Sequence, residues 1–189
     1  YRFYMDVRME ENFREYKIND YIICEELVNQ AWGFDKIFSS KALSDIAKLI
    51  YTKGSVLCSN YRSVVEVDGK VVGFIFGLNE HAKKPGRNIL FGLSVLWKLI
   101  RAKSDKTEKN DLINALKVHE KNRNIIVDRG RSEIILLVVH SEYHGNGFGK
   151  NLWAGFKEYC IKSNIGSIIV ETNKLGASSF YEHLFVYSF

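Results

Sequence analysis

The amino-acid sequence predicts an α/β (α+β) fold, and three features of the chain lead to that prediction. Strand-like and helix-like patterns follow one another along the whole chain of 189 residues. Two β-rich runs, 62–67 and 71–78, are separated by Asp68-Gly69, which is a strong hairpin signal. An apolar strand, 133–139, runs into a glycine-rich loop that is followed at once by a helix pattern. We expect a single domain, 1–189, with a substantial core.

The amino-terminal part of the chain predicts a strand and then a helix. Residues 12–18 have the composition of a strand. Asn19-Asp20 then provides a helix N-cap, and Gly33 provides a stop. We expect the core face of this helix to carry Ile23, Leu27 and Ala31.

A second helix is predicted from 40 to 50, closed by Lys53-Gly54. After the hairpin, about fifty residues at 80–132 precede the next strand. They contain an apolar helix pattern near 88–100 and a charged one near 107–121. The chain then predicts, in order, a strand at 133–139, a helix at 148–163, a strand at 168–171, a short helix at 177–184 and a last strand at 185–189.

The loop after strand 133–139 has glycine at every second position: Gly145, Gly147 and Gly149. A strand that leads through a glycine loop into the start of a helix forms an anion site. Free backbone N–H groups point outward there, and the helix dipole adds partial positive charge. Glycine lets the backbone approach a phosphate closely. The motif fits neither the P-loop, G-x-x-x-x-G-K-[ST], nor the dinucleotide fingerprint, G-x-G-x-x-G. A glycine-rich turn without a ligand is the simpler alternative, but one turn rarely needs three alternating glycines.

The segment 144–149, His-Gly-Asn-Gly-Phe-Gly, resembles the pyrophosphate loop of the GNAT superfamily of acetyl-CoA-dependent N-acetyltransferases. That loop reads R/Q-x-x-G-x-G/A after an apolar strand. Here His144 stands at the Arg/Gln position and Ser141 at a frequent Pro position. The order of predicted elements is similar to the GNAT fold as well. The resemblance implies a central mixed, mostly antiparallel sheet with helices on both faces, here with a helical, basic insertion at about 80–132 between strands 3 and 4.

Two features depart from the family pattern. The third and fourth strands are normally joined by a short turn, whereas here the insertion joins them. The segment Phe180-Tyr-Glu-His-Leu-Phe185 lacks the family's glycine, and no residues remain for a seventh strand. Either the sheet is short of one edge or a partner, such as a second copy in a homodimer, supplies it.

The resemblance implies an N-acetyltransferase that moves an acetyl group from acetyl-CoA, its co-substrate, to a primary amine by direct transfer, without a metal. A bulge in the strand before the loop frees backbone groups for the pantetheine arm, and an N–H of Val138 or Val139 polarises the thioester carbonyl. The cofactor-binding residues that the resemblance implies are Leu137, Val138, Val139, His144, Gly145, Asn146, Gly147, Phe148, Gly149, Lys150 and Asn173.

The resemblance also implies three catalytic residues. Glu133 is the first candidate for the general base, and Glu171, at the end of the next strand, is the second. If the bulge lies beyond Leu137, strand alternation places Glu133 on the same side as Ile135 and Leu137. Tyr181 matches the family's general acid. The alternatives stay open: both glutamates also fit solvated strand-end charges, and Tyr181 also fits core packing.

Two other functional classes are compatible with parts of the chain. A non-catalytic CoA-binding sensor or interaction module would keep the fold without turnover, and activity on an amine distinguishes it from the enzyme. A metallohydrolase could use His140 and His144, but no third ligand has suitable spacing.

The charge distribution and the cysteine content limit which partners and which cellular compartment we expect for this protein. Residues 80–132 hold 13 Lys/Arg and 6 Asp/Glu, so the basic character belongs to the insertion. A solvated helical face explains this more simply than a nucleic-acid surface. Three cysteines in apolar surroundings indicate reduced core thiols and a cytoplasmic protein. We expect an amine acceptor, a small molecule or a peptide, and no membrane or nucleic-acid partner. The apolar helix of the insertion either forms a lid on the acceptor cleft or packs against another helix or protomer.

Overall fold

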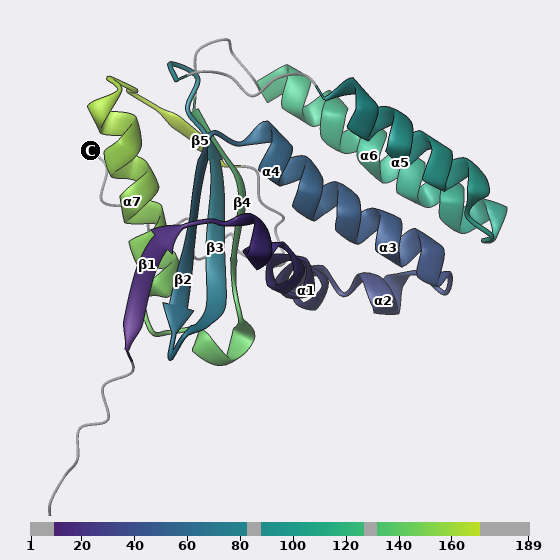
Figure 1. Ribbon diagram of the computed structural model, residues 1–189. Helices are drawn as coiled ribbons and strands as arrows, with labels where there is room; N and C mark the ends of the chain where they lie inside the picture. Colours follow the sequence, from purple (N-terminus) through teal and green to yellow (C-terminus); the bar gives the residue numbers. More distant parts are fainter. Residues whose placement is uncertain (1–9, 83–87, 127–131, 171–189) are drawn as a thin grey trace, which may run out of the picture.

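The computed structural model describes residues 10–82, 88–126 and 132–170, with the backbone alone over 118–126. Its strands form one sheet in the order β1-β2-β3-β4-β5 (Figure 1). The first three pairs are antiparallel and the β4–β5 pair is parallel, which confirms the predicted mixed, mostly antiparallel sheet. The strands are β1 (Glu11–Glu15), β2 (Tyr61–Val67), β3 (Lys70–Leu78), β4 (Ser132–Val139) and β5 (Ile168–Val170).

Helices cover both faces of the sheet, as expected (Figure 1). On one face, α1 (Tyr21–Trp32) and α3 (Lys41–Leu49) bury a cluster with Phe74 and Phe76 of β3. On the other face, α7 (Phe148–Lys162) buries Leu152 and Phe156 against Ile75. Alternate residues of β3 therefore serve two separate cores, which is the period of two that a strand imposes.

The β2–β3 hairpin forms as the sequence predicts. Asp68 and Gly69 have φ values of 50° and 76°. Two successive positive φ values are those of a type I′ turn, whose twist matches that of the paired strands. The turn holds β2 and β3 in the centre of the sheet, next to β4.

The first helix ends where expected but buries a different face. Gly33 has φ 67° and closes α1, because a left-handed residue is needed there and glycine adopts it without strain. The buried residues are Cys24, Leu27 and Val28, whereas Ala31 is exposed. Of the predicted face, Leu27 is buried, Ile23 is partly buried and Ala31 is exposed, so the buried side of the helix is turned towards Cys24 and Val28.

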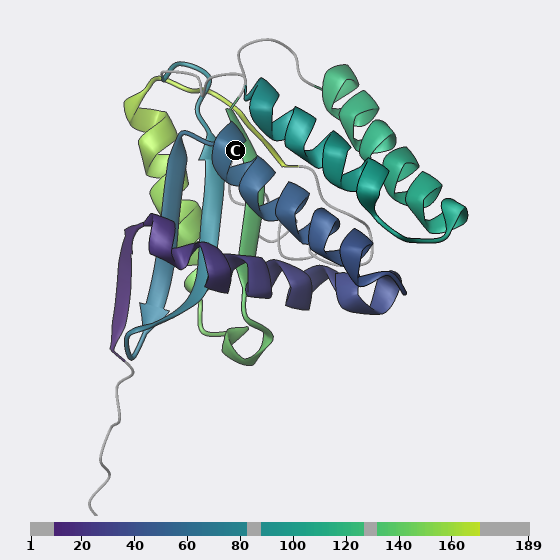
Figure 2. The same cartoon turned by 45° about the vertical axis from the view of Figure 1, so that its right-hand side comes forward.

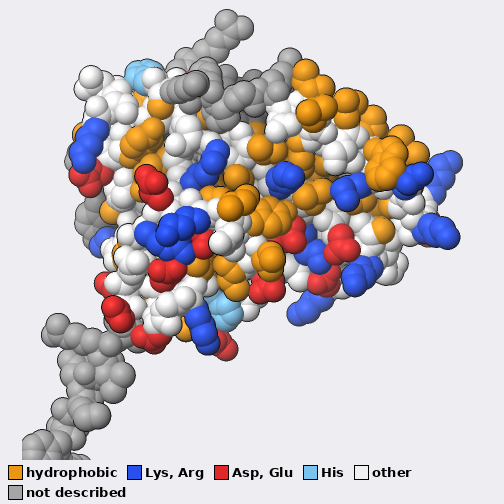
Figure 3. All heavy atoms as spheres, viewed as in Figure 1, with side chains coloured by type: hydrophobic (Ala, Val, Ile, Leu, Met, Phe, Trp, Pro, Cys, Tyr) orange, Lys and Arg blue, Asp and Glu red, His pale blue; other side chains and the backbone are white. Residues whose placement is uncertain are grey.

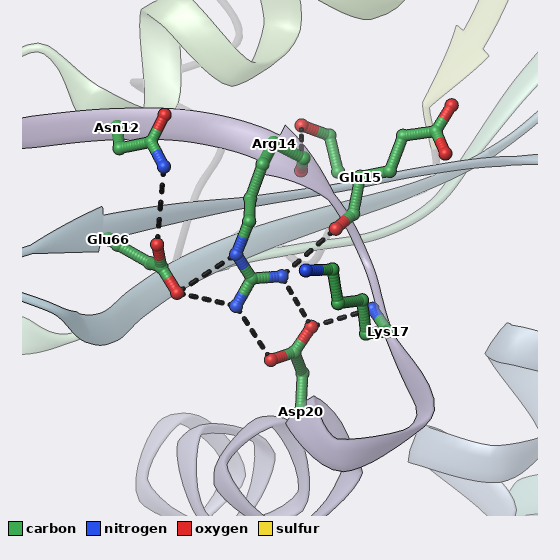
Figure 4. Close-up of polar contacts among 7 residues, drawn as sticks. Asn12, Arg14, Glu15, Lys17, Asp20 and Glu66 are labelled. Carbon is green, nitrogen blue, oxygen red and sulfur yellow. Dashed lines mark hydrogen bonds and ion pairs between the residues drawn. The ribbon is translucent and has the colours of Figure 1, made fainter.

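Asp20 does not cap α1 with its side chain, in contrast to the sequence-based prediction. Its two carboxylate oxygens accept bonds of 2.7 and 2.8 Å from the guanidinium of Arg14, and one also accepts from the backbone N–H of Lys17 (Figure 4). Arg14 donates to Glu66 of β2 as well. The network ties β1, β2 and the start of α1 together, because the bidentate pair engages both carboxylate oxygens of Asp20.

The second helix is longer than predicted. α3 continues through a π-helical turn, η2 (Ile50–Gly54), into α4 (Ser55–Cys58), so Lys53-Gly54 does not end it. A Cβ on Gly54 would lie 3.7 Å from the ring of Phe91, an ordinary van der Waals distance, so the insertion packs next to this turn. The sequence pattern also did not indicate α2 (Phe34–Ile37), which forms around buried Phe34.

The insertion between β3 and β4 is helical, as expected. It contains α5 (Ile89–Arg101) and α6 (Lys106–Ile126), which lie side by side in two views of the molecule (Figures 1 and 2). Leu99 of α5 and Leu112 of α6 are buried in the same cluster as residues of α1 and α3. The described contacts of the pair are thus with the α1–α3 layer and not with the glycine loop after β4.

Two of the three cysteines fit the sequence-based interpretation and one does not. Cys24 and Cys160 are buried, but Cys58 at the end of α4 is exposed, and all three are free thiols. Burial raises the pKa of the Cys24 thiol to about 12. No helix among the described residues is long and apolar enough to cross a membrane. The helix predicted at 177–184 and the strand predicted at 185–189 lie outside the described residues.

Candidate active site

Strand β4 carries a bulge near its start. Along the antiparallel β3–β4 pair, Phe76 is opposite Leu136 but Gly77 is opposite Ile134, so Ile135 is the extra residue. The bulge follows directly after the three residues of β4 that pair with β5. A bulge was expected in this strand, and its position is where the described parallel pairing ends.

The bulge changes the side on which Glu133 lies. Ile134, Leu137 and Val139 belong to the α7 core, so Glu133, next to Ile134, points to the opposite face. The prediction that Glu133 shares a side with Leu137 assumed that the bulge comes later, and it is wrong for that reason. Glu133 instead lies on the face of Leu136 and Val138, towards the α1–α3 layer.

The backbone of β4 presents Val139 to the outer edge of the sheet. The N–H of His140 donates to the carbonyl of Val72 in β3 at 2.8 Å. In an antiparallel pair, neighbouring residues direct their backbone groups to opposite edges. The N–H and C=O groups of Val138 therefore point to β3, whereas those of Leu137 and Val139 point to the β5 side. These two residues lie beyond Ile134–Val170, the last described pair between β4 and β5.

The connection from β4 to α7 is held by two histidines. His140 accepts from the backbone N–H of Glu142 through Nδ1, and its Nε2 lies 3.1 Å from the side-chain amide of Gln30 in α1. His144 Nε2 lies 2.8 Å from the carbonyl oxygen of Val139. A ring nitrogen facing a carbonyl must be the protonated donor. The short helix η3 (Ser141–Tyr143) lies between the two histidines.

Gly145 and Gly147 have φ values of 83° and 82°. Only glycine adopts this region without strain, so these two positions need it for the backbone conformation itself. No heavy atom lies within 4 Å of a Cβ built on either residue, so both face open space. The loop thus offers bare backbone to the outside.

Helix α7 starts directly at this loop, with Gly147 as its N-cap. Its first interior bond runs from the N–H of Asn151 to the carbonyl of Gly147. The N–H groups of Phe148, Gly149 and Lys150 precede that bond, and no described residue accepts from them. Phe148 is buried and anchors the turn, whereas Lys150 is exposed. Fifteen residues of helix add partial positive charge to these donors.

Comparison with known protein families decides what this arrangement is. A sequence profile of the acetyltransferase (GNAT) family matches residues 24–185. The chain belongs to the GNAT acetyltransferase family. The matched region includes β4, the glycine loop and α7, so the resemblance seen in the motif is confirmed over most of the chain. A comparison with curated proteins found no significant match.

Solved structures share the GNAT fold at low sequence identity. PH1933 from Pyrococcus horikoshii OT3 has 16% identity and a TM-score of 0.59 over 93% of this chain and 87% of that one. The aminoglycoside N-acetyltransferase AAC(6')-Iy, in complex with CoA, has 12% identity and a TM-score of 0.54 over 96% and 89%. A ribosomal-protein-alanine N-acetyltransferase from Brucella melitensis biovar Abortus 2308 has 11% identity and a TM-score of 0.50 over 93% and 90%. The GNAT chain is similar to these proteins in fold.

The structure brings some of the candidate residues of this GNAT chain together. Leu137 to Val139, His144 and Gly145 to Lys150 form one continuous stretch from the bulged strand to the start of α7. Glu133 lies on the same strand, nearly buried, opposite Leu78 of β3 and Ile169 of β5. Glu171, Asn173 and Tyr181 lie outside the described residues. Among the residues that are described, no cluster of three or more His, Cys, Asp or Glu could hold a metal ion.

Sequence reasoning missed two residues that position the site. Val72 accepts the hydrogen bond that continues the β3–β4 ladder to His140. Gln30 contacts the same histidine from α1. Neither has a local sequence signal, because each acts across more than sixty residues of chain. Only the exposed polar position of Gln30 at the end of an amphipathic helix could have drawn attention to it.

Proposed function

We propose that this chain transfers the acetyl group of acetyl-CoA directly to a primary amine. The observation that carries the proposal is the continuity of the bulged strand β4 with the glycine loop and the start of α7. One surface thereby offers backbone groups of an extended strand and, next to them, a set of N–H donors. A long cofactor with an amide-containing arm and a pyrophosphate needs these two features in this order.

The glycine loop fits a pyrophosphate. Gly145 and Gly147 have open space where side chains would stand, and the first N–H groups of α7 have no described acceptor. Lys150 adds a positive charge in the first turn. The residues that would hold the pyrophosphate are His144, Gly145, Asn146, Gly147, Phe148, Gly149 and Lys150. In this assignment His144 acts mainly by holding the loop to Val139.

The outer edge of β4 fits the pantetheine arm and the reacting carbonyl. The backbone groups of Leu137 and Val139 point to that edge, so Val139 is a better oxyanion donor than Val138, whose N–H points into the sheet. Acetyl-CoA supplies an activated thioester. The amine nitrogen forms a bond to the carbonyl carbon, the carbon–sulfur bond breaks, and one proton passes from the amine to a base while the thiolate takes up another.

Glu133 is the base in this proposal, directly or through a water molecule. An alkylammonium with a pKa of about 10.4 costs roughly 4.6 kcal/mol to deprotonate at pH 7, so a base is needed. Glu133 is nearly buried on the strand that carries Val139, on the face towards the α1–α3 layer. Glu171 is the second candidate for the base, Tyr181 the candidate acid and Asn173 a candidate contact to the cofactor arm, all three from the family resemblance alone.

The acceptor is a primary amine of a small molecule or of a peptide. Among the solved structures of similar fold, one is an aminoglycoside N-acetyltransferase and another a ribosomal-protein-alanine N-acetyltransferase, so the fold serves both classes. The decisive experiment measures thiol release from acetyl-CoA against a panel of polyamines, aminoglycosides, amino acids and amino-terminal peptides. Calorimetry with CoA is run beside it. Submillimolar CoA affinity with turnover of one class supports the proposal. CoA binding without turnover of any amine would make the chain a sensor, and millimolar or weaker CoA binding would refute the loop assignment.

A further inference from the structure

Helix α5 exposes one continuous apolar face. Six large hydrophobic side chains on it are between 53% and 79% exposed: Ile89, Leu90, Leu93, Leu96, Trp97 and Ile100. Their spacing of three, four and seven residues places them on one side of a helix. In the space-filling view, hydrophobic side chains gather along the outer edge of the molecule formed by the α5–α6 pair (Figure 3). An exposed apolar surface of this extent marks an interaction site.

The fold itself does not require this face to be apolar. The opposite side of α5, with Leu99 buried and Val95 partly buried, already packs on the α1–α3 layer. Both views of the ribbon place α5 on the other side of the sheet from α7 (Figures 1 and 2). The outward face is therefore additional to folding, and it is distant from the glycine loop.

The charged side chains on α5 and directly after it are basic. Residues 81–103 include six Lys or Arg and no Asp or Glu. Within this stretch the helix carries Lys98 and Arg101 in its last turn, and the guanidinium of Arg101 lies 4.2 Å from the ring centre of Trp97. A tryptophan beside basic side chains on an apolar helix is suited to the boundary between lipid headgroups and acyl chains. Acidic residues follow from Asp105 onwards, and Glu108 of α6 is bonded to Ser39.

The length of α5 decides how it could meet a lipid bilayer. Thirteen residues of helix span roughly 20 Å, less than the 30 Å or so of the hydrocarbon core. The helix is also fixed to α3 along its other side. It can therefore lie in the plane of a membrane surface and cannot cross the membrane.

We propose that the outward face of α5 docks this chain on an anionic lipid surface, with the six apolar side chains in the interface and the basic side chains on the headgroups. A second copy of the chain fits this face less well. The described basic side chains beside this face, Lys98, Arg101 and Lys103, gather at its carboxyl end, so a parallel pairing of two copies would set positive charges against each other. Docking by α5 departs from the sequence-based expectation of no membrane partner, and it does not depend on acetyl transfer.

Vesicle flotation tests the proposal. The full chain is mixed with vesicles of phosphatidylcholine alone, or with about 30% phosphatidylserine, at low and high salt. We expect binding to the anionic vesicles that weakens as salt rises. The double variant Leu93→Gln/Ile100→Gln should bind at least about tenfold more weakly, because two buried apolar side chains are lost from the interface. The matched control, Ile22→Gln/Ile161→Gln, changes two exposed residues on α1 and α7 and should bind as wild type.

Four results would overturn the proposal. Wild-type protein that stays unbound on anionic vesicles would refute docking. Equal binding to both vesicle types would refute the assignment to an anionic surface. Equal weakening of vesicle binding in the control variant would refute the assignment to α5. Sedimentation velocity covers the alternative: a dimer that Leu93→Gln/Ile100→Gln converts to a monomer, without vesicle binding, would assign the face to a second copy. Unchanged CoA affinity in both double variants shows that each is folded.

Discussion

The Nε2 atom of His144 lies 2.8 Å from the carbonyl oxygen of Val139, so the glycine loop is bonded back to the strand that it follows. We expect His144→Ala to lower CoA affinity about fivefold, since a neutral hydrogen bond contributes about 1 kcal/mol. His144→Gln retains a side-chain N–H donor and should keep most of the affinity. Calorimetry measures both variants. Wild-type affinity in His144→Ala would show that the bond does not order the loop.

An acidic side chain at position 147 should prevent tight binding of CoA. Gly147→Glu places a negative charge at the start of α7, and we expect CoA affinity to fall at least about 100-fold, because like charges a few ångströms apart repel by several kcal/mol. Gly147→Asn is the matched control, since asparagine tolerates the positive φ and carries no charge. It should lose about tenfold or less. Equal CoA affinities of the two variants would show that no phosphate group of CoA binds at this position.

Glu133→Gln should lower kcat at neutral pH by about 100-fold and leave CoA affinity nearly unchanged. The deficit should shrink as pH rises towards the pKa of the amine, about 10.4, where the free amine needs no base. Glu142→Gln, a change at an exposed carboxylate of the neighbouring connection, is the control and should be silent. If Glu133→Gln leaves kcat unchanged and Glu171→Gln lowers it strongly, the general base is Glu171.

Gly77 is needed where α7 contacts the bulged part of the sheet. A Cβ at this position would lie 2.4 Å from the ring of Phe156, which is fully buried, so the ring would have to shift. Gly77→Ala should therefore lower the free energy of unfolding by about 1–3 kcal/mol. Gly166→Ala, where an added Cβ meets open space, is the control. Urea unfolding compares them, and equal midpoints would mean that the helix can shift without cost.

The Arg14 network should give the protein a pH-dependent stability. The Arg14 guanidinium holds the pKa values of Asp20 and Glu66 below their usual ranges. Their contribution is therefore present above the unfolded values of about 4 and is lost as pH falls through the lowered folded values. Arg14→Gln should cost about 2 kcal/mol at pH 7, as expected for charged hydrogen bonds. Urea unfolding from pH 7 to about pH 2 should show the difference between wild type and variant disappearing in acid. A constant difference would contradict the pairing.

The sequence by itself determined the elements whose geometry is local. The type I′ turn at Asp68-Gly69, the end of α1 at Gly33 and the start of α7 after Gly147 each depend on a positive φ, which glycine adopts without strain. The glycine loop was recognisable for the same reason, and the family profile over residues 24–185 confirmed the resemblance that it showed. These features need only a few neighbouring residues, so a local pattern is enough to predict them.

The tertiary structure decided everything that depends on distant partners. The bulge at Ile135 exists only in the pairing of β4 with β3, and it moved Glu133 to the other face of the sheet. Asp20 has a local capping signal, but both of its carboxylate oxygens accept from the guanidinium of Arg14, which also donates to Glu66. In α5 the sequence showed apolar residues around the whole helix. Which side would be buried was set by α3, because a helix packs along one side and leaves the other to the solvent or to a partner.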